Sequence, residues 1–465
     1  MNPKIDAAIA ALQEDILLTL QKWIQIPSEK KPPEANAPFG LPLRQMLTAA
    51  LEDAENLGMR VRDFDGYIGD IEMGQGAETM GILAHLDVVP AGDGWLQDPY
   101  GGEIINGMIY GRGASDDKGP AVAALYAMKA VLDAGLTPAK KVRLLLGCDE
   151  ESGWDDIRYY QSRTAMPDFG FSPDAMYPVI NTEKGLLQLS LLAKLPKPSP
   201  SAEGVCVHSI HSGERPNVIP GLATAEISGL ADCQAAQTLL QKEGLQVEAH
   251  PLANGHIQLV SIGSAGHASM PKGCKNAAGQ LLLALKALHA GDAQVNKLIC
   301  CLADGIGLDY TGKGLGIDGA DSISGPLTLN LGTLHLEDGV FSAMLDIRYP
   351  VLMHADRIVR IIGLHVQDAG ISIEIASQKD PLHVPASSPI VQALLKVYHE
   401  VTGLPKETVA IGGGTYARSM ENCVAFGSSF PGEKELAHQA GECISIESLM
   451  TNVRIMAYAI AELAC

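Results

Sequence analysis

The stretch "TMGILAHLDVV", residues 79–89, decides the fold because it is a short apolar run that predicts a buried strand. His85 and Asp87 stand near its end. Downstream, "PAVAALYAMKAVLDAGL" (120–136) has helical spacing with Pro120 near its first turn, and "KVRLLLGCDE" (141–150) predicts a second buried strand. The order strand, helix, strand predicts a parallel sheet in an α/β fold.

The pattern of apolar and polar residues divides the chain into three segments. From about residue 183 it changes to shorter alternating segments separated by Pro and Gly, including a loop at "LPKPSPSAEG" (195–204), and helical spacing returns at 383–400. We therefore expect an α/β domain, a mostly parallel sheet with helices on both faces, formed by residues 1–182 and 383–465. An inserted α+β domain, residues 183–382, interrupts it.

Composition excludes several classes of partner. Across 465 residues, 34 Lys and Arg stand against 54 Asp and Glu, and the net charge of −20 would repel the phosphates of a nucleic acid. No apolar run approaches the length of a membrane span, and the amphipathic start lacks the features of an export signal. The nine cysteines form no CxxC pair. We expect a cytoplasmic protein without a thiolate zinc site.

His85 and Asp87 point the same way if they lie on a strand, because alternate side chains share a face. At the carboxyl edge of a parallel sheet they would face the crevice where such sheets bind ligands. One of the two side chains could then bind a metal ion while the other orients it for binding. For an isolated pair of this kind, a helix-capping aspartate beside a solvated histidine is the better interpretation.

Two acidic loops strengthen the metal interpretation. In "YGRGASDDKG" (110–119), Asp116 and Asp117 directly precede the predicted helix, where carboxylates are also favoured without any function. In "GCDEESGW" (147–154), Glu150 and Glu151 follow a strand, and neighbouring carboxylates repel unless a cation neutralises them. If one glutamate binds a metal, the other can accept a proton from water that the metal activates. The alternative is a solvated acidic turn.

Two further residues complete a possible ligand set. Asp174 in "FSPDAMYP" (171–178) and His438 in "ELAHQAGE" (435–442) each follow a predicted strand of the interrupted domain. With His85, Asp116 and Glu151 they make two imidazoles and three carboxylates. That set matches two divalent ions that share one bridging carboxylate.

The order and spacing of these motifs resemble the di-zinc exopeptidase family that contains peptidase V, peptidase T, aminoacylase and succinyl-diaminopimelate desuccinylase. The resemblance spans nearly the whole chain and is strongest to the peptidase V group of dipeptidases. It implies that His85 and Asp174 hold one metal, that Glu151 and His438 hold the other, and that Asp116 bridges them. It also implies that Asp87 supports the site, that Glu150 is the general base, and that the Asp116–Asp117 peptide is cis.

The resemblance further implies that residues 1–182 and 383–465 are catalytic and that the insertion is a lid. His267 in "GHASMP" would stabilise the oxyanion, while Asn217 in "RPNVIP" and Arg348 in "LDIRYP" would bind substrate. Backbone N–H groups of the run from Gly412 through Gly413 and Gly414 to Thr415 would approach the substrate carboxylate. Without the resemblance, each of these residues has an ordinary structural interpretation.

These motifs lead to the prediction of a cytoplasmic, monomeric metallo-dipeptidase that acts on short peptides. Its cofactors would be two divalent ions, zinc first, with manganese or cobalt as alternatives because sites rich in oxygen and nitrogen accept several metals. Two alternatives remain open at this point. One is an N-acyl amino acid amidohydrolase with the same metal site, and the other is a catalytically silent peptide-binding protein.

Overall fold

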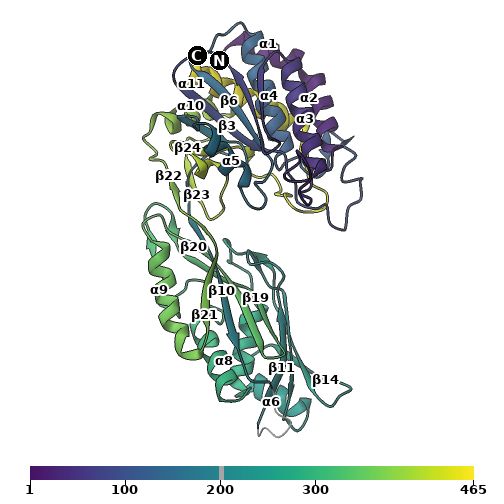
Figure 1. Ribbon diagram of the computed structural model, residues 1–465, viewed down its shortest axis with the longest axis vertical. Coiled ribbons are helices and arrows are strands. Elements are labelled where there is room, and N and C mark those ends of the chain that lie inside the picture. The colour runs from purple at the N-terminus through teal and green to yellow at the C-terminus, as the bar shows by residue number, and fades with distance from the viewer. Residues whose placement is uncertain (198–203) are drawn as a thin grey trace. The chain divides into compact units, whose positions relative to one another are not determined.

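The computed structural model describes residues 1–197 and 204–465, so the central part of the loop predicted at 195–204 lies outside the described residues. The chain divides into two compact units. The first comprises Met1–Thr182, His383–Val409 and Gly414–Cys465, and the second comprises Glu183–Leu382 and Ala410–Gly413. Figure 1 shows the elements of both units.

A nine-stranded sheet forms the core of the first unit. Its strands, in spatial order, are β1 (Arg60–Phe64), β2 (Ile68–Met73), β6 (Lys141–Gly147), β3 (Thr79–His85), β7 (Phe169–Ser172), β24 (Cys423–Phe426), β9 (Val179–Glu183) and β22 (Leu382–His383), with β23 (Thr408–Ile411) paired to β9. The predicted strand at residues 79–89 is β3, which ends at His85 and is buried along its whole length.

The α/β class is confirmed, but the sheet is parallel at its centre and antiparallel toward its edges. β3 runs parallel to β6 and β7, and β7 runs parallel to β24. The pairs β1–β2, β2–β6 and β24–β9 are antiparallel. β1 and β2 are joined by residues 65–67 alone, and a parallel pair would need a crossover of about a dozen residues. The short connection therefore forces the antiparallel arrangement.

Helices cover both faces of this sheet. On β2, a Cβ at Gly69 would meet Leu47 and Leu51 of α3 (Leu41–Asn56), while Asp70 accepts a hydrogen bond from Tyr160 of α5 (Asp155–Arg163). Because neighbouring strand residues point to opposite faces, α3 and α5 lie on opposite sides of the sheet. The helix predicted at 120–136 is α4 (Lys118–Asp133), which packs on α11 (Ile446–Ala464). The remaining helices of this unit are α1 (Pro3–Ala11), α2 (Gln13–Ile24), α10 (Pro389–Thr402) and the short η2 (Tyr416–Ser419).

Three short strands support the loop that carries Asp116. They are β4 (Glu103–Ile105), β5 (Met108–Tyr110) and β26 (Cys443–Ser445), with β26 antiparallel to β5. A further small pair joins β8 (Ala175–Met176) to β25 (Ser428–Ser429). The pairing of β26 with β5 brings the segment after His438 beside the segment before Asp116.

The second unit is an eight-stranded antiparallel sheet with helices on one face, an α+β arrangement. The strands, in spatial order, are β14 (Val247–Pro251), β15 (Ile257–Ile262), β13 (Leu222–Ser228), β11 (Cys206–Ser212), β19 (Thr328–Glu337), β20 (Val340–Tyr349), β10 (Gly185–Lys194) and β21 (Ser372–Lys379). Burial alternates along β10, and its buried leucines join a core with the helices α7 (Ala277–Ala287), α8 (Ala293–Gly305) and α9 (Ala355–Val366). The unit also contains α6 (Cys233–Lys242), η1 (Gln367–Ala369) and the strand pairs β12 (Val218–Ile219) with β16 (Gly266–His267) and β17 (Ala320–Asp321) with β18 (Gly325–Pro326).

Across residues 1–197 and 204–465, every helix is too short or too polar to cross a lipid bilayer.

Candidate metal centre

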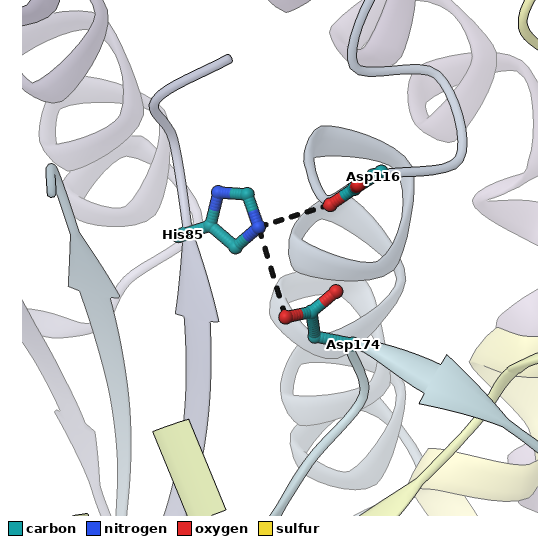
Figure 2. Close-up of side chains that lie close together, drawn as sticks. All are labelled: His85, Asp116 and Asp174. Carbon is teal, nitrogen blue, oxygen red and sulfur yellow. Dashed lines mark hydrogen bonds and ion pairs between the residues drawn. The ribbon is translucent and has the colours of Figure 1, made fainter. Parts of the chain in front are cut away.

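The parallel strands of the first unit bring three predicted site segments to one edge of the sheet. β3 ends at His85, which pairs in register with Gly147 at the end of β6, and β7 ends at Ser172 on the other side of β3. The loop with Glu150 and the turn with Asp174 therefore follow strands that end beside His85. Figure 2 shows His85, Asp116 and Asp174 at this edge.

The first candidate ligand group consists of His85, Asp116 and Asp174. The Nε2 atom of His85 lies 3.0 Å from Oδ1 of Asp116 and 3.8 Å from Oδ2 of Asp174. The other ring nitrogen, Nδ1, donates to the backbone carbonyl of Asp87 at 2.9 Å. A carbonyl can only accept, so this bond places the proton on Nδ1 and leaves Nε2 to face the two carboxylates.

The second candidate ligand group consists of Asp116, Glu151 and His438. The Nε2 atom of His438 lies 2.8 Å from Oε1 of Glu151 and 3.1 Å from Oδ2 of Asp116. Asp116 thus belongs to both groups, with Oδ1 toward His85 and Oδ2 toward His438. The peptide between Asp116 and Asp117 is cis, as the resemblance implied.

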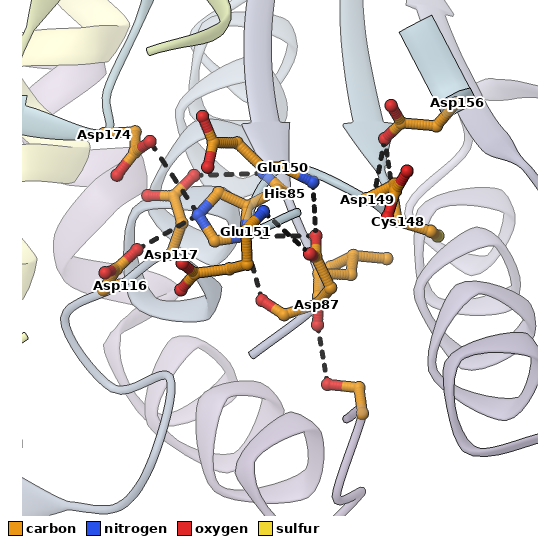
Figure 3. A network of polar contacts seen from close by, with 12 residues as sticks. His85, Asp87, Asp116, Asp117, Cys148, Asp149, Glu150, Glu151, Asp156 and Asp174 are labelled. Atoms are coloured by element: carbon orange, nitrogen blue, oxygen red, sulfur yellow. Dashed lines mark hydrogen bonds and ion pairs between the residues drawn. The ribbon is translucent and has the colours of Figure 1, made fainter. Parts of the chain in front are cut away.

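Asp87 lies beside these candidate ligands and holds the acidic loop that follows β6. Its Oδ1 accepts the backbone N–H of Glu150 at 3.1 Å, and its Oδ2 accepts that of Glu151 at 3.0 Å. Oδ1 also lies 3.4 Å from Nδ1 of His85, so the closer contact of that ring is to the Asp87 carbonyl. Figure 3 shows this network, in which the buried Asp87 connects His85 to both glutamates.

The crowding of carboxylates around two imidazoles shifts their proton affinities. Burial alone would lower the pKa of His438, but hydrogen bonds to Asp116 and Glu151 raise this pKa to about 10. Burial would also lower the pKa of His85, but the contact with Asp116 and the nearby carboxylates of Asp87 and Asp174 raise it. With a pKa of about 10, the His438 ring is an imidazolium cation at neutral pH when no metal ion is bound, and the pKa of His85 is shifted in the same direction.

The carboxylates respond to the same crowding in two ways. Burial would raise the pKa of Asp116, but hydrogen bonds from His438 and His85 outweigh it and lower this pKa. Burial, followed by the negative charge of Asp116, raises the pKa of Asp174 and also that of Glu151. A cation at this place would offset both the burial cost and the repulsion that raise these two pKa values.

The donor set fits divalent metal ions. Within each group the ligand atoms lie within 4.8 Å of one another, and all are imidazole nitrogens or carboxylate oxygens. Three carboxylates and two neutral imidazoles carry three negative charges, which suits two dipositive ions. Zinc and manganese both accept such donors, so the residues do not select one metal.

The other predicted site residues divide between the two units. Gly414 and Thr415 belong to the first unit, where the buried Thr415 caps η2 by accepting the N–H of Ala417 at 3.2 Å. The second unit holds the remaining predicted residues, which are His267, Asn217, Arg348, Gly412 and Gly413.

Within the second unit, strand pairing places His267 beside Asn217. β16 pairs with β12 so that His267 faces Val218, and the N–H of Ala268 donates to the carbonyl of Asn217 at 2.9 Å. The exposed ring of His267 also lies 2.7 Å, through Nδ1, from the hydroxyl of Ser269. His267 and Asn217 therefore share one short two-stranded element.

Arg348 is buried in the same unit, and Asp346 orients it. Its Nε and Nη2 donate to the two carboxylate oxygens of Asp346 at 2.6 and 3.0 Å, and its Nη1 donates to the carbonyl of Gly412 at 2.8 Å. A Cβ at Gly412 would lie 2.6 Å from Cβ of Ser269, so a glycine is needed where this loop meets the His267 segment. Arg348, Gly412 and the His267 segment are thus neighbours.

Several supporting residues were not identified from sequence. Asp156, near the start of α5, accepts the N–H groups of Cys148 and Asp149 and the hydroxyl of Tyr416, and burial raises its pKa to about 7. Asp117 accepts the backbone N–H of His85 at 3.1 Å. Arg112 and Glu442 form a buried ion pair. Asp117, Arg112 and Glu442 stood inside quoted motifs, but nothing in the motifs indicated which partners they would contact.

Known proteins resemble this chain in sequence and in fold. A model of peptidase family M20/M25/M40 matches residues 81–462. The Bacillus subtilis (strain 168) protein named "Putative dipeptidase YtjP" is 39% identical over 460 residues, 97% of this chain and 98% of that protein. The Beta-Ala-Xaa dipeptidase of Lactobacillus delbrueckii subsp. lactis is 35% identical over 461 residues, 97% of each chain. The crystal structure of human carnosine dipeptidase 1 has the same fold, with a TM-score of 0.61 and 17% identity over 99% of this chain and 98% of that one.

The predicted relationship to the di-zinc exopeptidases is therefore confirmed at the level of the family. The family model covers most of the chain, and both sequence relatives align over nearly their full lengths. The chain belongs to peptidase family M20/M25/M40 and is a metallopeptidase.

Proposed function

We propose that this metallopeptidase is a dipeptidase with a dinuclear metal centre. The observation that carries the proposal is the position of Asp116, whose two carboxylate oxygens face His85 and His438 separately. One carboxylate shared by two adjacent ligand groups is the arrangement that a pair of bridged ions requires. The two sequence relatives described above are both named as dipeptidases, which supports short peptides as substrates.

In the proposed centre, His85 and Asp174 hold one ion, Glu151 and His438 hold the other, and Asp116 bridges them. Two bound divalent ions would supply positive charge that acidifies a water molecule and polarises the peptide carbonyl. The Nδ1–H bond from His85 to the Asp87 carbonyl would keep the Nε2 lone pair directed at its ion. Zinc is the first expectation, with manganese and cobalt as alternatives.

Glu150 is the proposed general base. It would take a proton from the attacking water and return it to the leaving amine. Asp87 supports this role because it fixes the backbone of Glu150 and Glu151 with its two carboxylate oxygens. The proposed base and the proposed ligand are therefore held by one buried side chain.

The proposed substrate contacts come from the segments that the resemblance identified. Arg348 would bind the substrate carboxylate with its planar guanidinium, helped by Asn217 and by the backbone of Gly413, Gly414 and Thr415. His267 would stabilise the oxyanion. In this proposal the second unit acts as a lid, the protein acts as a monomer, and its location is the cytoplasm.

The experiment that tests the proposed function compares two substrate classes after metal removal. The protein is stripped with a chelator, each divalent metal is returned in steps, and turnover is measured on unblocked dipeptides and on N-acetyl and N-succinyl amino acids. We expect turnover of dipeptides that is lost on stripping and restored by metal. Preferential turnover of the acylated amino acids would favour the amidohydrolase alternative, and peptide binding without turnover in the metal-loaded protein would overturn an enzymatic role.

A further inference from the structure

A fully buried carboxylate, Glu442, receives the backbone of the loop that carries Asp116. Its Oε1 accepts the N–H groups of Gly113, Ser115 and Asp116 at 3.0, 3.0 and 3.1 Å. The hydroxyl of Ser115 donates to the same oxygen at 3.1 Å. The backbone carbonyl of Glu442 also accepts the N–H of Gly111 at 3.0 Å. Converging N–H groups of this kind form a concave site that favours an anion.

The second oxygen of Glu442 is neutralised by a buried arginine. Oε2 accepts from Nη1 of Arg112 at 2.6 Å, and Arg112 is 1% exposed. The same guanidinium donates to the carbonyl of Ala91 at 3.2 Å and to that of Gln439 at 3.5 Å. Arg112 therefore joins the segment after β3, its own loop and the segment that follows His438.

We propose that Glu442 is the positioning residue that fixes Asp116 relative to His438. Glu442 follows His438 by four positions, so its own backbone belongs to the loop that presents this imidazole. Its side chain reaches the backbone N–H of Asp116, whose two oxygens lie 3.0 Å from His85 and 3.1 Å from His438. One buried carboxylate thereby connects the loops of the shared ligand and of one terminal ligand.

The charge of Glu442 is essential to this connection. A glutamine has the same shape, but its amide group would present N–H donors either to Arg112 or to the three converging N–H groups. Either orientation loses a charge-assisted bond and leaves the Arg112 cation without its carboxylate. The loop that carries Asp116 would then lose its fixed position.

The inference rests on the proposed metal centre, and its test is made without substrate. Glu442→Gln is compared with Glu435→Gln, an exposed glutamate of the same segment whose loss changes the net charge equally. Zn²⁺ affinity is measured by competition with a chelator, and the visible absorption of each protein is recorded at saturating Co²⁺. We expect the affinity of Glu442→Gln for the more weakly bound of the two Zn²⁺ ions to fall by about 10–100-fold. This is the usual effect of losing a residue that hydrogen-bonds and orients the metal-binding segment. The Co²⁺ spectrum should change in Glu442→Gln and stay unchanged in Glu435→Gln.

The Co²⁺ spectrum distinguishes a positioning role from a general loss of stability. A variant that is only less stable keeps the wild-type spectrum when it is folded and saturated with Co²⁺, because its ligand geometry is unchanged. Unchanged Zn²⁺ affinity, or weakened affinity with an unchanged Co²⁺ spectrum, would overturn the inference. If Glu442→Gln does not fold, the double variant with Arg112→Gln, which removes the unpaired cation, is judged by the same two measurements. Failure of the wild-type protein to cleave dipeptides would count against the proposed function alone, because neither measurement uses a peptide.

Discussion

The buried carboxylate of Asp87 accepts the backbone N–H of Glu151 through Oδ2 at a distance of 3.0 Å. Its other oxygen accepts the N–H of the preceding residue, so both acceptors are engaged by consecutive backbone donors. These protein contacts fix the acidic loop at the end of β6. A fixed loop reduces the ordering that metal binding and catalysis would otherwise require.

Asp87→Asn tests this anchoring. Asparagine keeps one acceptor oxygen but presents an NH₂ group to the other backbone N–H, so the loop should move. We expect metal affinity or turnover to fall by about 10–100-fold, as for other residues that support metal ligands. Chelator competition and steady-state kinetics measure the two quantities. The exposed Asp93→Asn serves as the control, and equal behaviour of the two variants would show that Asp87 does not anchor the loop.

Glu150→Gln tests the proposed base. The substitution keeps the shape of the side chain and leaves the backbone N–H available to Asp87. We expect metal content and thermal unfolding to stay at wild-type values while turnover falls by roughly two or more orders of magnitude. Metal analysis, a melting curve and a dipeptide assay provide the measurements. Turnover near the wild-type rate would exclude Glu150 as the base.

Metal binding should release protons. The pKa of His438 is raised to about 10 in the metal-free site, so its ring is protonated at neutral pH and must become neutral to bind a metal. Raising the pH removes this competing proton, and affinity should therefore increase by about tenfold per pH unit for each proton displaced. Calorimetry in buffers of different ionisation enthalpy counts the protons. Heats that do not depend on the buffer would contradict the prediction.

Asp346→Asn tests how the proposed carboxylate-binding arginine is oriented. Asp346 accepts two hydrogen bonds from Arg348, and an amide can accept at only one oxygen. We expect KM for dipeptides to rise by about tenfold or more, the effect of losing a charge-assisted bond, with unchanged metal content. The exposed Asp338→Asn is the matched control on the connection between β19 and β20. A fall in metal content instead of a rise in KM would contradict this role.

Mixing two inactive variants tests whether a single chain is competent. The insertion, residues 183–382, is long enough to be a domain of its own, and we expect His267 to act within its own chain. His267→Ala and Glu150→Gln proteins are mixed under conditions that allow subunit exchange, and dipeptide turnover is measured. No recovery of activity is expected. Recovered activity would mean that His267 acts in a partner chain, because mixed dimers would contain one complete site.

The sequence by itself indicated the elements whose signal is local. The continuous apolar run before His85 predicted β3, and the helical spacing after Pro120 predicted α4. Both signals depend only on residues that are close together in the sequence. It also predicted that His85 would lie at the edge of a parallel sheet. The pairing of the five candidate ligands into two groups came from the resemblance, since spacing cannot show which distant residues meet.

The tertiary structure decided the contacts that join distant segments. The sheet is antiparallel at β1–β2, and the Nδ1 atom of His85 donates to the backbone carbonyl of Asp87 instead of its carboxylate. Glu442 meets the N–H of Asp116 across 326 positions of sequence. Every residue except proline carries a backbone N–H, and every residue carries a carbonyl. The amino-acid sequence therefore does not show which backbone groups form a hydrogen bond with a given side chain. Only the path of the folded chain determines which of them a buried carboxylate or imidazole will reach.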